Sequence, residues 1–138
     1  PQDVQIEMDR TLDACRNNDG MTLVLAINYG SRSEIVDAMT AIARRVQAGD
    51  VSCDAITEEM VGQHLYTASI PDPDLLIRTS GEMRISNFLL WQISYAEIWV
   101  TATLWPEFDR QHLADAIGDY AARDRRYGGL QTSLESSV

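Results

Sequence analysis

The chain has 138 residues, of which 45% are hydrophobic, and a formal net charge of −10 at pH 7. This length and composition fit one ordinary globular domain and exclude a disordered chain. The acidic balance argues against nucleic-acid binding, which needs a basic surface, and against electrostatic adsorption to anionic lipid. All 11 positive residues are arginine. Each of them has to be interpreted from its local surroundings.

The two cysteines, Cys15 and Cys53, have neither metal-ligand spacing nor the pattern of a disulfide framework, so we expect reduced, buried thiols. The most apolar stretch, residues 88–105, is interrupted by Gln92, Ser94 and Glu97 and makes a poor membrane span. No signal peptide is visible at the start of the sequence. These features favour a cytoplasmic protein.

The first half of the chain predicts a helix, a strand and a second helix. The first helix is predicted over residues 3–17, where apolar side chains form one stripe: Val4, Met8, Leu12 and Cys15. The apolar run 21–28 lies between two glycines and predicts a buried strand. Ser31 or Ser33 is then the expected N-cap of a helix that ends near residue 48. Its predicted buried stripe is Ile35, Met39, Ile42 and Val46.

The second half continues the alternation. Thr57 precedes two glutamates and predicts a helix start, because the helix dipole favours acids in the first turn. "LLIR" (75–78) and "EIWVT" (97–101) predict two further strands, with a helix over residues 87–95 between them. Asp109 is the expected N-cap of a last helix. One face of that helix should carry Leu113, Ala116, Ile117, Tyr120 and Ala121.

Helices that alternate with short buried strands predict an α/β fold with a mostly parallel sheet flanked by helices. Three strands are few for such a sheet, since parallel sheets usually have more strands and are covered on both faces. No internal repeat or linker interrupts the sequence. We therefore expect residues 1–138 to form a single but incomplete domain segment, with a frayed tail at residues 130–138.

The loop after the strand at residues 75–78 gathers the polar side chains that suggest chemistry. Ligands of open α/β sheets bind beyond the carboxyl ends of the strands, which is where Arg78 falls. Arg84 and Ser86 follow in the same loop, and a helix beginning at residue 86 or 87 would add free N–H groups. Together these groups predict a cradle for a phosphate or a diphosphate.

The spacing leaves a second interpretation open, in which the two arginines pair on a solvated surface with nearby acids: Glu82, Asp72 or Asp74. Ser86 would then be an ordinary N-cap. Glu97 lies in an otherwise apolar stretch, where a carboxylate is costly unless it is paired or binds a cation. It is therefore either the ion-pair partner of one of those arginines or a ligand of Mg²⁺, which commonly binds one or two carboxylates plus substrate phosphates.

Two stretches of the chain carry a family resemblance. "DLLIRTSGEMRISNFLLWQISYAEIWVTATLWPEF", followed by a helix and "RRYGG", resembles the C-terminal part of the cis-prenyltransferases, the family of bacterial undecaprenyl diphosphate synthase. "LAINYGSRSEIVDA" is similar to an upstream segment of the same family. The resemblance implies a Mg²⁺-dependent transferase that condenses isopentenyl diphosphate with an allylic diphosphate, such as farnesyl diphosphate, into a cis-polyprenyl diphosphate. In bacteria that product carries cell-wall sugars.

The resemblance also implies roles for individual residues. Arg78, Arg84 and Ser86 would bind the diphosphate of isopentenyl diphosphate, and Glu97 would take part in the Mg²⁺ site. A homodimer is implied, in which an R-x-G motif reaches the active site of the partner subunit: Arg126 and Gly128. Asn28 would support the active site. The lipid product would bring this cytoplasmic enzyme into peripheral contact with the membrane.

The sequence departs from the family pattern in two places. Ser31 stands where the family's "NYGG" has its second glycine. The family's D-G-N-G-R-W motif, which holds the catalytic aspartate and binds the allylic diphosphate, does not occur in the 138 residues. We therefore expect a C-terminal part that is inactive alone. The alternatives are a non-catalytic partner subunit of a cis-prenyltransferase complex and a general phosphate-binding α/β module.

Overall fold

The structure is a computed structural model that describes residues 1–124. Its elements in chain order are α1 (Gln2–Cys15), α2 (Ser31–Ala48), η1 (Cys53–Ala55), α3 (Glu58–Gly62), β1 (Leu75–Arg78), β2 (Glu97–Val100), η2 (Trp105–Glu107) and α4 (Arg110–Ala122). The predictions of α1, α2, α3, α4 and the strands β1 and β2 are confirmed. The tail at residues 130–138, Arg126 and Gly128 lie outside the described residues.

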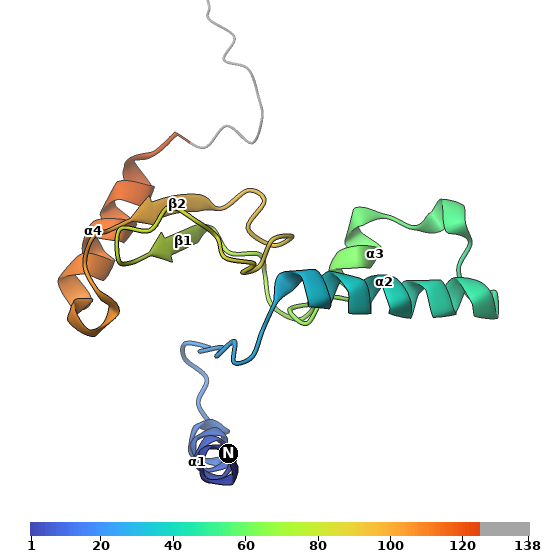
Figure 1. Ribbon diagram of the computed structural model, residues 1–138, viewed down its shortest axis with the longest axis horizontal. Helices are drawn as coiled ribbons and strands as arrows, with labels where there is room; N and C mark the ends of the chain where they lie inside the picture. The colour runs from blue at the N-terminus through green and yellow to red at the C-terminus, as the bar shows by residue number, and fades with distance from the viewer. Residues whose placement is uncertain (125–138) are drawn as a thin grey trace, which may run out of the picture.

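The two strands form a parallel pair, with Leu75 opposite Glu97 and Arg78 opposite Val100. A parallel pair needs a crossover between its strands, and residues 79–96 provide it. Helix α4 follows β2 and packs against it, whereas α2 packs with α3 away from the sheet (Figure 1). This arrangement confirms an α/β fold with a parallel sheet and flanking helices.

The predicted strand at residues 21–28 is wrong. This segment is irregular, and Leu23, Val24 and Leu25 are 73%, 56% and 63% exposed. A strand exists only when its N–H and C=O groups bond to a neighbouring strand. Within residues 1–124 the sheet consists of β1 and β2 alone, and neither pairs with this segment. The apolar run therefore has the composition of a strand, but no neighbouring strand among the described residues pairs with it.

The predicted helix at residues 87–95 is also wrong, because the segment folds as a series of turns. Ser86, Asn87 and Leu89 have positive φ angles of 53°, 61° and 48°. A left-handed residue cannot continue a right-handed α-helix. The free helix N-terminus that was expected to add N–H groups to the anion cradle is therefore not formed.

The apolar core of the described residues is small and consists of Ala38, Ile42, Leu65, Ile93 and Ala116. Helix α1 buries none of its side chains and lies apart from the other elements in Figure 1. Its predicted apolar stripe is present but uncovered. Cys15 and Cys53 are free, as predicted, but they are exposed rather than buried, because nothing in the described chain packs on them.

Helix α2 buries Ser31, Glu34, Ala38 and Ile42, a face that shares Ile42 with the predicted stripe but is otherwise rotated away from it. Met39, which belongs to the predicted stripe, is 60% exposed. The buried face includes two polar residues, and residues from elsewhere in the chain bond to both of them. Hydrogen bonding therefore decides which side of α2 faces inward.

Candidate anion-binding site

The loop after β1 folds back onto the residues that follow β2. The amide of Ser80 donates to the carbonyl of Thr103 at 2.9 Å, and the amide of Gly81 donates to the carbonyl of Thr101 at 2.8 Å. Ser80 and Gly81 both have φ near +66°, which is a tight turn that glycine adopts without strain. The turn brings the next residue, Glu82, back beside Arg78.

Two arginines converge on Glu82. Arg78 and Arg84 each donate a hydrogen bond to Glu82, one to each carboxylate oxygen. Arg78 is the more enclosed of the two, with a side chain 32% exposed against 64% for Arg84. The hydrogen bond from Arg78, followed by the charges of both arginines, lowers the pKa of Glu82 against the opposing effect of burial. The pairing with Glu82 confirms one alternative left open by the sequence, and it also brings two guanidinium groups around a single anion.

Arg78 has a further donor without a partner. Its Nε is buried and makes no hydrogen bond within the described part of the chain. Buried donors are almost always satisfied in folded proteins.

Ser86 lies two residues beyond Arg84 and is exposed. The structure thus brings Arg78 and Arg84 together and places Ser86 further along the same loop.

Glu97 lies at the other end of the strand pair. It is opposite Leu75, three residues before the level of Arg78, which is about 10 Å at the usual rise of a strand. Its partner is Arg123, whose Nη1 donates to Glu97 Oε2 at 2.8 Å and whose Nη2 donates to Asp119 at 2.5 Å. The bonds to Glu97 and then Asp119 raise the pKa of Arg123. The expected ion pair therefore exists, but with Arg123 rather than with Arg78 or Arg84.

The described residues do not form a ready-made magnesium site. Within residues 1–124 no three acids, histidines or cysteines gather in a way that could hold a metal ion. Glu97 already has a cationic partner, and Glu82 has two. A metal ion would have to compete with these arginines for either carboxylate.

A second polar cluster surrounds Glu34, which is fully buried. Its carboxylate accepts from the amide of Tyr66 at 2.8 Å, from Gln92 Nε2 at 3.2 Å to each oxygen, and from the Tyr29 hydroxyl. Burial, followed by the bond to Glu34, raises the pKa of Tyr29. The cluster joins α2 to two distant segments. Sequence reasoning missed Glu34, although its spacing of four from Ala38 places it on the stripe that is buried.

Asn28 lines an apolar cavity of about 380 Å³. Phe88 and Leu89, which directly follow Ser86 and Asn87, line the same cavity. Asn28 has a φ of 53°, a left-handed conformation that asparagine adopts more readily than most residues. The structure therefore places Asn28 on the same cavity as the segment that continues from the arginine loop.

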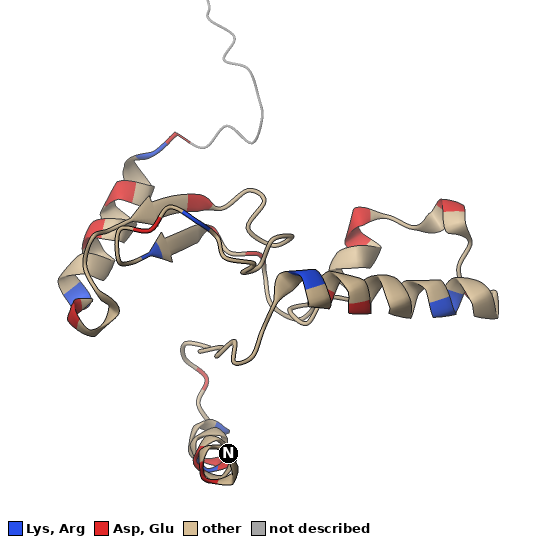
Figure 2. Cartoon of the chain, viewed as in Figure 1, with Lys and Arg blue, Asp and Glu red and all other residues tan. Residues whose placement is uncertain are grey.

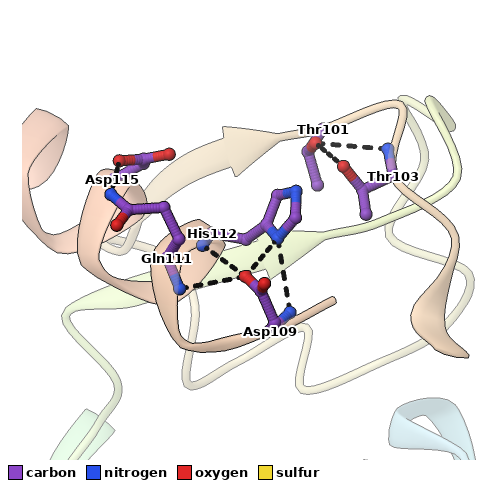
Figure 3. A network of polar contacts seen from close by, with 6 residues as sticks. All are labelled: Thr101, Thr103, Asp109, Gln111, His112 and Asp115. Carbon is purple, nitrogen blue, oxygen red and sulfur yellow. Dashed lines mark hydrogen bonds and ion pairs between the residues drawn. The ribbon is translucent and has the colours of Figure 1, made fainter. Parts of the chain in front are cut away.

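His112 lies outside this site and belongs to a helix cap. Asp109 accepts from the amides of Gln111 and His112 at 2.9 and 3.2 Å, and its own amide donates to His112 Nδ1 at 3.3 Å (Figure 3). The hydrogen bonds that the Asp109 carboxylate accepts, chiefly those from His112, lower its pKa. This reciprocal arrangement is a capping box, and it confirms Asp109 as the predicted N-cap of α4.

Charge on the described residues is mixed rather than segregated. Figure 2 shows acidic and basic positions scattered over the helices, with no continuous basic face. The convergence of Arg78 and Arg84 is thus a local feature of one loop. Arg78 is the last residue of β1 and Arg84 lies in the loop that follows it. The structure thus defines a class of protein, an α/β protein with two arginines at the sheet edge where ligands of such folds usually bind.

The comparisons with known proteins narrow this class to one family. The family described as putative undecaprenyl diphosphate synthase matches residues 1–128, and the chain belongs to this prenyltransferase family. It is 54% identical over 125 residues to an isoprenyl transferase of Heliobacterium mobile, covering 91% of this chain and 48% of that protein. It is 49% identical over 130 residues to one of Halalkalibacterium halodurans, covering 94% and 51%. The chain thus spans about half the length of the curated relatives it matches.

Two solved structures share the fold. One is a lavandulyl diphosphate synthase from Lavandula x intermedia, solved in complex with dimethylallyl diphosphate. It matches with a TM-score of 0.85 at 40% sequence identity, and the match covers 93% of this chain and 55% of the synthase chain. A probable undecaprenyl diphosphate synthase from Campylobacter jejuni has a TM-score of 0.73 at 33% identity, with coverage of 93% and 57%. The fold is that of the cis-prenyltransferases.

The described part of the chain has no helix long and apolar enough to span a membrane.

Proposed function

We propose that this chain supplies the isopentenyl diphosphate half of a cis-prenyltransferase active site. The enzyme would condense isopentenyl diphosphate with an allylic diphosphate resembling farnesyl diphosphate and make a cis-polyprenyl diphosphate lipid carrier. The observation that carries the proposal is the convergence of Arg78 and Arg84 on Glu82 beyond the carboxyl end of β1. Membership of the prenyltransferase family supports it.

The arginine loop has the chemistry that a diphosphate requires. A diphosphate carries more negative charge and more acceptor oxygens than one carboxylate, so both guanidinium groups can exchange Glu82 for it. The unsatisfied Nε of Arg78 offers another donor, and the Ser86 hydroxyl can add a neutral hydrogen bond. In this proposal Glu82 keeps the two arginines together while the diphosphate is absent.

The contribution of this half-site to catalysis would be positioning. Holding the diphosphate fixes the attached alkene close to the reacting carbon of the allylic substrate. Well-oriented reactions of this kind gain at most about 7–11 kcal/mol from the entropy that binding has already removed. The family's D-G-N-G-R-W motif, which would serve the departure of the allylic diphosphate, does not occur in the 138 residues. Residues 1–138 on their own are therefore proposed to bind isopentenyl diphosphate without turnover.

The proposal also includes a Mg²⁺ cofactor, a homodimer and a cytoplasmic location, because the family resemblance implies them. Mg²⁺ is often held by few protein carboxylates together with substrate phosphates, so the lack of an acidic cluster in the described residues is compatible with it. Glu97 would contribute only after parting from Arg123. Arg126 and Gly128 are proposed to reach a partner subunit, Asn28 to support the active site, and the enzyme to be cytoplasmic with peripheral membrane contact. Calorimetric titration of isopentenyl diphosphate with and without Mg²⁺ tests the metal.

The two alternative functions have less support. A non-catalytic partner subunit has no need for Arg78, Arg84 and Glu97 together, and a general phosphate-binding module would not match the prenyltransferase family over residues 1–128.

The proposed function predicts a split between the two substrates. In the smallest form of this protein that turns over both diphosphates, Arg78→Ala and Arg84→Ala should raise the KM for isopentenyl diphosphate much more than the KM for the allylic diphosphate. The reason is that the two arginines contact only one of the substrates. Steady-state kinetics with each substrate varied in turn measures this split. Equal losses for both substrates would contradict the assignment.

A further inference from the structure

The first turn of α2 is capped by a residue from a distant part of the chain. The residue at its N-cap position, Gly30, has no side chain to accept from the first helical amides, which lack partners within the helix. Asn87 takes this role. The amide of Ser31 donates to the Asn87 carbonyl at 2.9 Å, and the amide of Arg32 donates to Asn87 Oδ1 at 2.9 Å.

The contact is reciprocal. The amide of Leu90 donates to Ser31 Oγ at 2.9 Å, and Ser31 is fully buried. Gly30 allows the close approach, because a Cβ at this position would lie 2.9 Å from Asn87 Nδ2. A real Cβ almost never comes that close to another atom, so the side chain of Asn87 would have to move. The sequence signals that fix the junction are therefore a glycine at residue 30 and an asparagine at residue 87.

The same junction explains an unusual stretch of backbone. Ser86, Asn87 and Leu89 are all left-handed without being glycine. Such residues persist only where surrounding contacts hold them. The three hydrogen bonds to Ser31 and Arg32 provide those contacts. They hold Asn87, which directly follows Ser86, and the backbone of Leu90, which directly follows Leu89.

We propose that Asn87 is a positioning residue for the diphosphate site. By capping α2 it fixes the backbone immediately after Ser86 and three residues after Arg84, and so sets where their side chains lie relative to Arg78. This inference rests on the proposed function of the arginine loop and adds a residue that would not touch the substrate. Asn87 acts through its Oδ1 and its carbonyl, both of which face α2 rather than the loop.

Three substitutions at this junction separate the hydrogen bond from the backbone conformation. Asn87→Gly removes Oδ1 and tolerates the left-handed φ, whereas Asn87→Asp keeps an acceptor oxygen in place and suits the helix N-terminus. Gly30→Ala displaces the side chain of Asn87 from the opposite side of the contact. Each variant is titrated with isopentenyl diphosphate by calorimetry, and its thermal midpoint and the hydrogen exchange of residues 31–32 and 84–90 are measured.

The proposal expects that Asn87→Gly and Gly30→Ala weaken binding about fivefold, as for the loss of one ordinary hydrogen bond, and that Asn87→Asp binds within twofold of wild type. Wild-type affinity in Asn87→Gly would overturn it, as would equal weakening in Asn87→Asp. If the wild-type protein binds no isopentenyl diphosphate, the proposed function fails by itself. The junction is then judged by hydrogen exchange, where faster exchange at residues 84–87 in Asn87→Gly but not in Asn87→Asp supports it and unchanged exchange overturns it.

Discussion

At the scale of single residues, Glu82 has two roles that depend on its charge. It neutralises part of the repulsion between Arg78 and Arg84. In the proposed function it also holds the position that the diphosphate would take. Because its pKa is lowered in the folded protein, the stabilising contribution is fully present above the usual carboxyl pKa of 4.5. It is lost as the pH falls through the lowered value. At neutral pH the charged Glu82 therefore compensates one of the two positive charges.

We predict that the pKa of Glu82 responds to the ligand. Without diphosphate, NMR titration of its side-chain carboxyl should give a pKa below 4.5, because both guanidinium groups stabilise the charged form. With saturating isopentenyl diphosphate the pKa should rise, since the arginines then pair with the ligand and a negative charge lies nearby. Asp115 on α4 serves as a control carboxyl. A Glu82 pKa that stays the same in the two titrations would show that the ligand does not replace it.

The residues of the candidate site could be predicted from the sequence to a limited degree. Arg78 and Arg84 were found because a short apolar strand and the rule for parallel sheets place them at one edge. Their shared partner remained undecided, because spacing cannot distinguish a carboxylate in the same loop from an external anion. Glu97 was assigned to the same place by resemblance, and the parallel register puts it at the other end of the strands.

At the scale of elements, the helices with their own capping residues were predicted well. Thr57 accepts from the amide of Met60 at 3.2 Å, and Asp109 forms the capping box of α4. Both caps lie next to their helices in the sequence and can be read from it. The predicted N-cap of α2, Ser31 or Ser33, is wrong: Gly30 holds that position, and the side-chain acceptor comes from Asn87, 55 residues from Arg32. The failed strand and helix likewise depend on long-range contacts rather than on local pattern.

We predict that the cap of α4 can be tested by one pair of substitutions. Asp109→Ala removes the acceptor for two helix amides and should lower the thermal midpoint, whereas Asp109→Asn keeps an acceptor and should lower it much less. Circular dichroism during heating measures both variants. Because the pKa of Asp109 is lowered, its stabilising contribution is fully present above pH 3.8 and is lost as the pH falls through the lowered value. Equal midpoints for the two variants would contradict a capping role.

At the scale of the whole molecule, the described residues leave much apolar surface uncovered. Leu12, Met21 and Leu23 are 66%, 90% and 73% exposed, and α1 buries no side chain. An ordinary domain of this length would bury such residues in a contiguous core. The chain spans about half the length of the curated relatives it matches. The small number of strands predicted from the sequence agrees with this uncovered surface, since the described sheet has only two strands.

We predict that residues 1–138 bind apolar dyes and associate in solution. Exposed apolar surface of this extent favours self-association because burial removes it from water. Anilinonaphthalene sulfonate fluorescence and sedimentation velocity at several protein concentrations measure the two effects. Leu12→Gln and Leu23→Gln should reduce both, and Leu65→Gln, at a buried position, serves as a destabilised control. A monomer that binds no dye would show that these side chains are covered in solution.

The most direct test of the central claim is the affinity of this chain for isopentenyl diphosphate with and without the two arginines. We predict saturable binding by calorimetry that weakens about 10- to 100-fold in Arg78→Ala and in Arg84→Ala, as expected for the loss of hydrogen bonds between charged groups. Arg44→Ala, which removes an exposed arginine from α2, should bind like wild type. Absence of binding to the wild-type chain, or binding that is unchanged in both variants of the arginine loop, would contradict the claim that this loop holds the diphosphate.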